Sequence, residues 1–332
     1  MTIRNAGGGE APVPVKSLLL RGLYPATLTP FNEDYSLDLP ALRVHLDTVA
    51  GTAGVQGLVV SGGIGELMQL SLDEQITIVQ EARRVLRPGQ IVVTGLSAPN
   101  ARQAVAQATA LKAAGADALL MFPPFDSRAY RRLTTHTPSV VQYFSEVARA
   151  GVPMVIFQYG PESGCAYSVE TFLALAQIPE VVAVKATSGS LEAYQPYWDA
   201  LQDRLSIMAA VDGPPLYDML SYGAHGALIG ISSVGTCNWV DLVEATRSGN
   251  DARAREIFTR HCAPLMARLW ENHKPTRLSS TVSAAKEAWV QLGKMPSSRV
   301  RAPIIAVDDK VRAEIRLGLI EAGLLAPQSA AA

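Results

Sequence analysis

The chain has 332 residues, of which 48% are hydrophobic and 18% are charged, and its formal net charge is −1 at pH 7. This length and composition can bury a large core, either in one α/β barrel with an appendage or in two ordinary domains. The nearly neutral charge excludes a strongly basic face, so we expect neither nucleic acid nor an acidic membrane surface as a partner. The apolar run at residues 18–20 is too short for a signal peptide or a membrane span.

The cysteines indicate the cellular compartment and the metal chemistry. Cys165, Cys237 and Cys262 are odd in number and widely spaced, without a C-x-x-C pair. This usage fits reduced thiols, so we expect a cytoplasmic protein. Cys262 stands beside His261, but two neighbouring side chains do not make a metal site, and no metal is expected.

From Gly22 onward, short apolar runs alternate with longer segments of helical character. The predicted strands lie at residues 23–29, 57–60, 91–94, 118–122, 153–157, 181–185, 205–210 and 226–231. The predicted helices lie at residues 39–52, 72–86, 101–114, 139–150, 169–178, 191–201, 215–222 and 240–247. Eight alternating pairs over about 225 residues match the number and length of a (β/α)8 TIM barrel. A doubly wound sheet would also alternate, but the first strand leads into Thr29-Pro30-Phe31-Asn32 rather than a glycine-rich phosphate loop.

The strand pattern stops after Gly249. Three further helices are predicted at residues 252–272, 283–292 and 308–325. We therefore expect a flexible N-terminal tail at 1–17, the barrel as the catalytic domain at 18–248, a C-terminal three-helix extension at 249–325 and a frayed tail at 326–332. The extension is a candidate oligomer contact.

The sixth predicted strand, Val181-Val182-Ala183-Val184-Lys185, is apolar until its last residue. Such a run is typical of a strand buried on both faces in a parallel sheet. In a TIM barrel the chemistry lies at the C-terminal ends of the strands, where Lys185 would stand. Burial lowers the pKa of a lysine, and a neutral amine is the nucleophile that forms a Schiff base with a carbonyl. The alternative is a lysine that reaches solvent or pairs with a carboxylate.

Five groups of residues, in order along the chain, carry a resemblance to a known superfamily. They are Tyr24-Pro25-Ala26-Thr27-Leu28-Thr29-Pro30-Phe31, Gly62-Gly63-Ile64-Gly65-Glu66, Gly115-Ala116-Asp117-Ala118, Val184-Lys185 and Gly223-Ala224-His225-Gly226. Together they resemble the dihydrodipicolinate synthase/N-acetylneuraminate lyase superfamily over residues 20–325. The resemblance implies that Lys185 condenses with the C2 carbonyl of a 2-keto acid, without a metal or diffusible cofactor. It also implies a homo-oligomer, either a dimer or a tetramer.

The loop after strand two departs from the pattern of that superfamily. In the synthase and the lyase it carries two hydroxyl side chains that help to hold the substrate carboxylate. Gly63 and Ile64 stand at those positions, so we expect the backbone amides of Gly62, Gly63 and Ile64, called the cradle below, to bind the carboxylate. The order Gly-Gly-x-Gly-Glu is similar to the sugar-acid dehydratase branch. Glu66 is expected to anchor backbone amides rather than to act in catalysis.

Strand five departs further. The resemblance implies a proton-relaying tyrosine at its end, but alignment without gaps places Phe157 there, and its ring cannot carry a proton. Tyr159 would share a face with Phe157 and is a candidate for the proton transfer; the alternative is a rim residue that packs on the loop. The segment 156–164, with a glutamine at position 158, resembles the strand-five end of L-2-keto-3-deoxyarabonate dehydratases.

A third departure lies after strand four. The synthase borrows a tyrosine across its dimer interface, and this chain has Asp126 at that position. The loop that follows is longer than in the synthase. Its basic side chains are those of Arg128, Arg131, Arg132 and His136. They are candidates for contact with a carboxylate or hydroxyls over the barrel mouth, and the alternative is a solvated basic loop.

We therefore predict a Schiff-base lyase that acts on a 2-keto acid, with dehydration of a 2-keto-3-deoxy sugar acid as the preferred reaction. Dihydrodipicolinate synthase activity is not expected, because Ile64, Phe157 and Asp126 replace its relay residues, whereas water loss requires no capture of an aldehyde. The predicted catalytic residues are Lys185 and Tyr159, and the predicted substrate-binding residues are the cradle, Phe157, Thr187, Ser188 and Asp126. The alternatives are an aldolase that releases or condenses pyruvate, and a barrel that binds a keto acid without turning it over.

Overall fold

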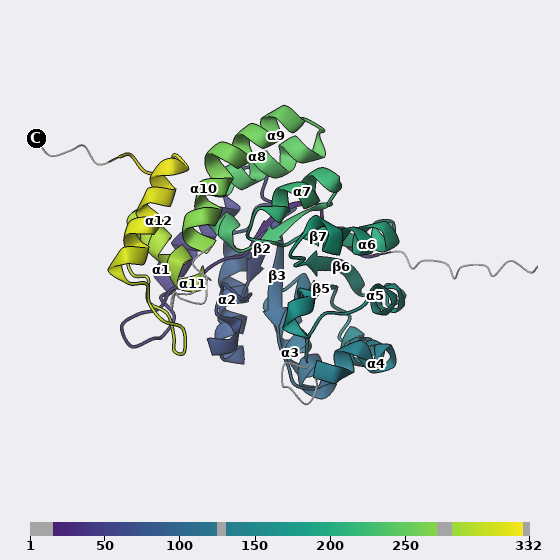
Figure 1. Cartoon of the computed structure of the whole chain (residues 1–332). Helices are drawn as coiled ribbons and strands as arrows, with labels where there is room; N and C mark the ends of the chain where they lie inside the picture. The colour runs from purple at the N-terminus through teal and green to yellow at the C-terminus, as the bar shows by residue number, and fades with distance from the viewer. Residues whose placement is uncertain (1–15, 125–130, 271–280, 328–332) are drawn as a thin grey trace, which may run out of the picture.

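A computed structural model of the chain describes residues 16–124, 131–270 and 281–327. Eight parallel strands form one sheet in the order β1-β8-β7-β6-β5-β4-β3-β2. Isolated bridges from Leu23 to Val55 and from Ala26 to Val59 join β1 to β2, so the sheet closes almost completely into a barrel. Helices alternate with the strands around this barrel (Figure 1). The prediction of a (β/α)8 TIM barrel is confirmed.

The strands and barrel helices follow the predicted order. The strands are β1 (Gly22–Pro25), β2 (Gly57–Val60), β3 (Ile91–Leu96), β4 (Ala118–Met121), β5 (Met154–Gln158), β6 (Val181–Ala186), β7 (Ser206–Ala209) and β8 (Gly226–Ile229). The helices are α1 (Leu39–Ala50), α2 (Leu72–Val85), α3 (Ala101–Ala114), α4 (Thr137–Ala148), α5 (Val169–Leu175), α6 (Leu191–Leu201), α7 (Pro215–Tyr222) and α8 (Thr236–Arg247). Short 3-10 helices η1 (Leu67–Gln69), η2 (Arg131–Thr135), η3 (Pro161–Ser163) and η4 (Ile231–Ser233) follow β2, β4, β5 and β8.

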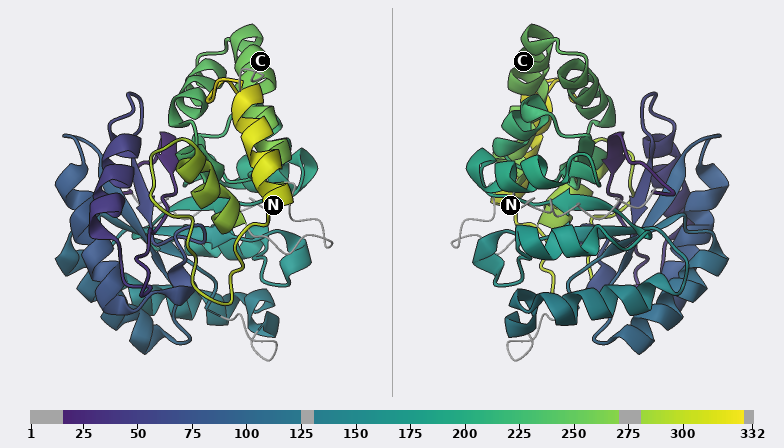
Figure 2. Two further views of the ribbon diagram at one scale, coloured as in Figure 1. Left: turned by 90° about the vertical axis from the view of Figure 1, so that its left-hand side faces the viewer. Right: turned by 90° about the vertical axis from the view of Figure 1, so that its right-hand side faces the viewer.

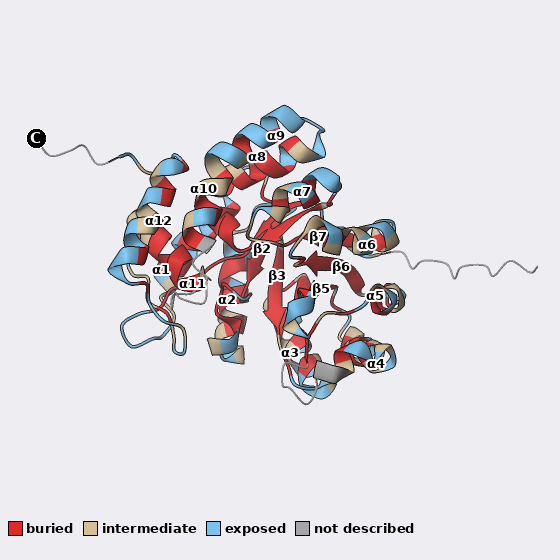
Figure 3. Ribbon diagram, in the orientation of Figure 1, coloured by how far each residue is buried: buried red, intermediate tan, exposed pale blue. Residues whose placement is uncertain are grey.

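Burial explains why the apolar runs become strands. Every residue of β6 is buried, and Figure 3 shows the barrel strands in the colour of buried residues while the outer faces of the helices are exposed. Polar side chains then fix where helices begin. The Ser71 hydroxyl accepts a hydrogen bond from the Glu74 amide, and the Glu74 carboxylate accepts one from the Ser71 amide, which forms a capping box at α2.

Several predicted boundaries differ from the observed ones by a few residues, and the two largest differences in the barrel are at the first strand and the eighth helix. The first strand was predicted to run to residue 29 but ends at Pro25, because its partner β8 ends at the paired residue Ile229 before turning into η4. The eighth helix was predicted to begin at residue 240 but begins at Thr236. Its first turn, Thr236-Cys237-Asn238, consists of poor helix formers and therefore carries no helical signal in the sequence.

The C-terminal region is helical, as predicted. The segment predicted as one helix at 252–272 consists of α9 (Asp251–Ile257), the π-helical η5 (Phe258–Cys262), α10 (Ala263–Leu265) and the π-helical η6 (Met266–Trp270). Helices α11 (Thr281–Gln291) and α12 (Asp309–Glu321) follow, and Figure 2 shows α12 in yellow beside the green helices on one flank of the barrel. Arg268 of η6 links this segment to α12, because its guanidinium lies 2.5 Å from the Glu314 carboxylate and 2.8 Å from the Glu321 carboxylate. No helix in the described ranges is long and apolar enough to cross a membrane.

Gly95 in β3 fixes the close approach of β3 to the loop after β2. A Cβ atom on Gly95 would lie 1.9 Å from the carbonyl oxygen of Ser61, which belongs to the backbone and cannot turn away. We expect Gly95→Ala to lower the free energy of unfolding by about 3 kcal/mol in urea titrations. Gly63→Ala is the control, because a Cβ there meets no atom within 4 Å, and its stability should stay within about 1 kcal/mol of the wild type. Equal stabilities of the two variants would contradict this account.

Candidate active site

Lys185 lies at the C-terminal end of β6, on the inner face of the barrel. It is paired in register with Phe157 of β5, and its Nζ atom lies 4.0 Å from the centroid of the Phe157 ring. The residue is only 9% exposed. The lysine therefore does not reach bulk solvent freely.

The surroundings of Lys185 favour the neutral amine. Burial in the apolar barrel lowers its pKa to about 8, against a smaller opposing effect of the Asp212 carboxylate, which favours the charged form. Asp212 follows β7, and its Oδ1 accepts a hydrogen bond of 2.9 Å from the Ile231 amide in η4. At pH 7 about one amine in ten is then neutral, compared with far fewer for an exposed lysine.

Three aromatic rings pack at the mouth of the barrel beside the lysine. Phe157 stacks on Tyr159 with 4.4 Å between ring centroids and 16° between planes. Phe122, after β4, meets Phe157 edge to face at 5.0 Å. Tyr159 therefore lies on the same side of the chain as Phe157, as the sequence predicted, and it stacks on the ring over which the Lys185 amine lies.

A cavity of about 420 Å³ opens beside these rings. Its described lining residues are Met68, Phe122, Pro123, Tyr159, Glu162, Ser163 and Cys165. Lys185 is not among them, but Tyr159 and Phe122 both line the cavity and both contact Phe157, on which the amine lies. The cavity thus extends from Met68 in η1, which follows β2, to the loop after β5. This end of the barrel is the expected place for a ligand in this fold.

In the cradle, the carbonyl groups of Gly62 and Gly63 are engaged in hydrogen bonds, whereas the amides are free. The carbonyl oxygens of Gly62 and Gly63 accept hydrogen bonds of 3.1 and 3.2 Å from the Leu67 and Glu66 amides. Within the described chain, the amides of Gly62, Gly63 and Ile64 donate to no other loop or side-chain group. Successive free amides in a turn are a common anion-binding feature, but the role of the cradle as the carboxylate site stays a prediction.

Comparison with known proteins identifies the family. The model of the Dihydrodipicolinate synthetase family matches residues 19–321. The chain belongs to this family. A 4-hydroxy-tetrahydrodipicolinate synthase from Methanothrix thermoacetophila is 28% identical over 300 residues, 90% of this chain and 95% of that protein. An uncharacterized DapA-like lyase from Rhizobium meliloti is 27% identical over 89% of this chain and 95% of its own length.

Solved structures of the dihydrodipicolinate synthetase family share the fold. The chloride-inhibited synthase from Acinetobacter baumannii, complexed with pyruvate, superposes with a TM-score of 0.80 at 22% identity over 92% of this chain and 99% of that chain. A sialic acid aldolase from Ruminococcus gnavus superposes with a TM-score of 0.77 at 18% identity over 91% and 97%. The barrel architecture is therefore common to lyases of this family and to a sialic acid aldolase.

Gln158, Thr187 and Ser188 lie near Lys185 in the sheet or in the chain. The Gln158 side chain points away from the amine, because it donates 2.9 Å hydrogen bonds to the Tyr167 carbonyl and the Tyr197 hydroxyl. Thr187 is half-buried and its hydroxyl lies 3.5 Å from the Ala210 carbonyl, while Ser188 is buried. Their assignment as hydroxyl ligands for a substrate stays a prediction.

Other predicted positions are only partly described. Asp126 and Arg128 lie outside the described residues, and the side chains of Arg131 and Arg132 are not described. His136 precedes α4, and its Nδ1 lies 2.8 Å from the Ser139 hydroxyl. The roles predicted for these residues stay predictions.

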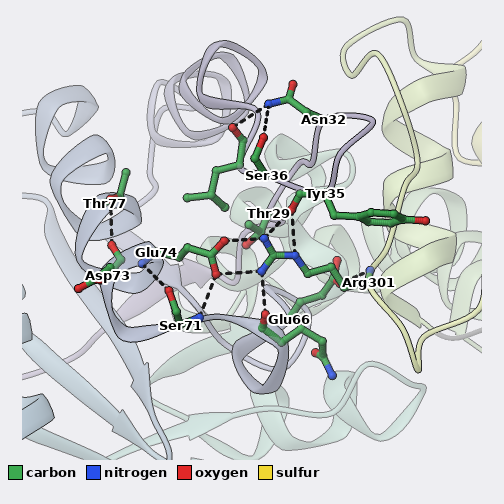
Figure 4. Close-up of polar contacts among 12 residues, drawn as sticks. Thr29, Asn32, Tyr35, Ser36, Glu66, Ser71, Asp73, Glu74, Thr77 and Arg301 are labelled. Atoms are coloured by element: carbon green, nitrogen blue, oxygen red, sulfur yellow. Dashed lines mark hydrogen bonds and ion pairs between the residues drawn. The ribbon is translucent and has the colours of Figure 1, made fainter.

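Glu66 anchors backbone, as expected from its place after a glycine turn. Its Oε2 accepts a 3.0 Å hydrogen bond from the Arg301 amide, and its Oε1 pairs with Lys286. Figure 4 shows Arg301 beside it, with the guanidinium between Glu74 and the Tyr35 carbonyl. The sequence did not predict these C-terminal partners.

Two further site residues were missed in the sequence. Asp212 lies in the loop after β7, which ends at Ala209, and an acid at that end of a barrel strand was the available signal. Glu162 lies in η3, in the wall of the cavity, and only its closeness to Tyr159 in the chain pointed to it.

Proposed function

We propose that this member of the dihydrodipicolinate synthetase family is a Schiff-base lyase for a 2-keto acid, with Lys185 as the nucleophile. The observation that carries the proposal is the amine itself, buried at the C-terminal end of β6, over an aromatic ring, with a pKa lowered to about 8. A structural lysine at this place would need a carboxylate partner that outweighs its burial, whereas the effect of Asp212 on the Lys185 pKa is smaller than that of burial. The apolar surroundings suit a nucleophile that must be neutral when it attacks.

The reaction begins with attack of the Lys185 amine on the C2 carbonyl, and loss of one water gives an iminium ion. Its positive nitrogen accepts electrons from C3, so that a C3 proton becomes acidic. In the proposed dehydration this proton leaves to a base, and the C4 hydroxyl leaves as water after it accepts a proton. Hydrolysis of the imine then frees Lys185 and releases a dehydrated 2-keto acid. The chain needs no metal or diffusible cofactor for these steps.

The cradle and Tyr159 take the other two roles. The free amides of Gly62, Gly63 and Ile64 hold the substrate carboxylate, which fixes C2 relative to the lysine. Tyr159, stacked on Phe157, carries the proton that Phe157 cannot carry. Thr187 and Ser188, which follow β6, bind substrate hydroxyl groups.

Dehydration of a 2-keto-3-deoxy sugar acid is the preferred reaction. The cavity wall offers Glu162, whose carboxylate oxygens can accept hydrogen bonds from substrate hydroxyl groups. A negative Glu162 would in turn disfavour a substrate with a second carboxylate. Phe157 and Ile64 stand where the synthase pattern has hydroxyl side chains, and dehydration makes fewer demands on those positions because no aldehyde must be captured.

An aldolase that releases or condenses pyruvate is the second candidate. It is favoured by the curated relatives, several of which are named 4-hydroxy-tetrahydrodipicolinate synthase at 25–29% identity. Both reactions start from the same iminium ion, so Lys185 and the cradle would serve either. A cytoplasmic homo-oligomer is proposed for both.

A product assay separates the candidates. The wild-type protein is incubated with a panel of 2-keto-3-deoxy sugar acids that differ in chain length and stereochemistry, and products are identified by mass spectrometry. Loss of one water from the substrate mass with no free pyruvate is the expected result for at least one member. Release of pyruvate would replace the dehydratase by the aldolase. Imine formation without any product would leave a barrel that binds keto acids without turnover.

Asp212→Asn should shift the pH dependence of imine formation to lower pH. The Asp212 carboxylate raises the pKa of Lys185, so its removal lowers that pKa below about 8 and increases the neutral fraction at a given acidic pH. The rate of imine formation in stopped-flow experiments should rise with pH to a plateau, and the midpoint should move to lower pH in the variant. The amide side chain of the variant keeps an oxygen that can accept the hydrogen bond from the Ile231 amide, so the loop should remain in place. A midpoint that stays or rises would contradict the assignment.

A further inference from the structure

We infer that the C-terminal extension positions the cradle through the buried ion pair between Lys286 and Glu66, so that both are positioning residues for the substrate carboxylate. The inference rests on the proposed function, because it takes the cradle as the carboxylate site. Glu66 follows the cradle by two residues in the chain, whereas Lys286 lies on α11, outside the barrel. The pair therefore joins the rim of the barrel to a segment 220 residues away in the chain.

The pair is completely removed from water. Both side chains are 0% exposed. Lys286 Nζ donates to Glu66 Oε1 and to the Arg299 carbonyl at 2.6 Å, and the second Glu66 oxygen accepts the Arg301 amide at 3.0 Å. Each oxygen of the Glu66 carboxylate is thus tied to a residue of the extension. The carboxylate cannot turn without leaving a buried charge unpaired.

The backbone of the loop needs such an anchor. Ser61 and Glu66, on either side of the four residues from Gly62 to Gly65, have φ angles of +49° and +61°. Residues other than glycine rarely adopt this region, and they persist there when the surrounding contacts hold them. Glu66 in this conformation donates its amide to the Gly63 carbonyl. The backbone conformation of Glu66 is therefore linked to the hydrogen bond that engages the Gly63 carbonyl.

Arg301 adds a second clamp from the same segment. Its guanidinium donates to the Gln69 carbonyl at 2.7 Å, to the Tyr35 carbonyl and to the Glu74 carboxylate (Figure 4). Gln69 ends η1, the short helix that follows Glu66, and its amide donates to the Glu66 carbonyl at 2.8 Å. The extension therefore holds the loop at Glu66 and again one turn later.

The location of the pair points to positioning rather than to stability alone. A fully buried ion pair contributes little net stability compared with apolar side chains of the same shape. Here it holds the residue whose strained backbone shapes the anion site. Its loss should let Glu66 relax, and the amides of the cradle should then bind a carboxylate more weakly. Lys185 stands on β6, on the other side of the barrel, so its chemistry should be spared.

Lys286→Met tests the inference, with Arg268→Met as the matched control. Arg268 makes ion pairs with Glu314 and Glu321 in the same extension without contacting the cradle. Steady-state kinetics with the substrate found for the wild type should show a rise in KM of about tenfold or more in Lys286→Met, with kcat within about threefold of the wild type. Hydrogen exchange at the Glu66 and Leu67 amides should become at least about tenfold faster. Arg268→Met should change neither quantity.

A double variant covers the case in which the single one does not fold. Glu66→Gln with Lys286→Met leaves no buried charge, and the glutamine oxygen still accepts the Arg301 amide. It should recover stability but keep the raised KM and the fast exchange, because the link from the loop to α11 is missing. Unchanged KM and unchanged exchange in a folded variant would overturn the inference. A third outcome is that the wild type binds no keto acid while exchange is still faster in the variants. This result would overturn the proposed function and the carboxylate role of the cradle, and the ion pair would then only anchor the loop.

Discussion

Lys185→Met should abolish turnover and should leave a folded protein. Removal of the amine takes away the only group proposed to form a covalent bond with the substrate, so kcat/KM should fall by at least about 10⁴-fold. Methionine has a similar length and no charge, and burial of the charged amine is unfavourable at this site. The melting temperature should therefore equal or exceed that of the wild type. Activity is measured by the product assay, and stability by thermal unfolding followed by circular dichroism.

Lys294→Met is the matched control for that variant. Lys294 is exposed near the C-terminal end of α11, where it lies over the Trp289 ring, and it contacts no residue of the proposed site. Its loss should leave kcat/KM within about twofold of the wild type. Substantial activity in Lys185→Met, or an equal loss in both variants, would refute the assignment of Lys185 as the nucleophile.

Tyr159→Phe should separate imine formation from proton transfer. The variant keeps the ring stacked on Phe157 and loses only the phenol hydroxyl. If Tyr159 carries the proton, kcat should fall by about 10²- to 10⁴-fold, whereas the amount of imine trapped at saturating substrate should be unchanged. Tyr222→Phe is the control, because Tyr222 ends α7 at the opposite end of the barrel and its hydroxyl contacts Asp199.

The outcome of the tyrosine experiment distinguishes three accounts. A large loss of kcat with full trapping supports the shifted proton carrier. Unchanged kcat would make Tyr159 a rim residue, and Glu162 in the same cavity wall would become the next candidate for the proton transfer. Full trapping in a wild type that makes no product would favour a protein that binds keto acids without turnover.

Most of the barrel could be predicted from local patterns. Each strand is a short apolar run, and each is buried, so its signal does not depend on distant contacts. The same reasoning placed Lys185 at the end of β6, because the position of the run alone determines which end of the barrel its last residue occupies. The prediction was wrong where a boundary depends on a neighbour, as at the end of β1, which is set by its partner β8.

The site could be predicted only where its residues belong to one short segment of the chain. The stacking of Tyr159 on Phe157 follows from their spacing of two residues within one strand and its extension. The pair of Glu66 with Lys286 joins residues 220 positions apart, and no spacing rule connects them. In the sequence Lys286 follows Ser283-Ala284-Ala285, and this pattern identifies neither its burial nor its partner. The division into tail, barrel and extension stays a prediction.

Borohydride trapping tests the central claim most directly. The wild-type protein is incubated with pyruvate and with each 2-keto-3-deoxy sugar acid at a pH near the Lys185 pKa of about 8, reduced with sodium borohydride, and analysed by intact mass and peptide mapping. We expect one stable adduct per chain, on Lys185, with at least one keto acid, and none in Lys185→Met. No adduct with any keto acid in the folded protein, or an adduct on another lysine, would contradict the account.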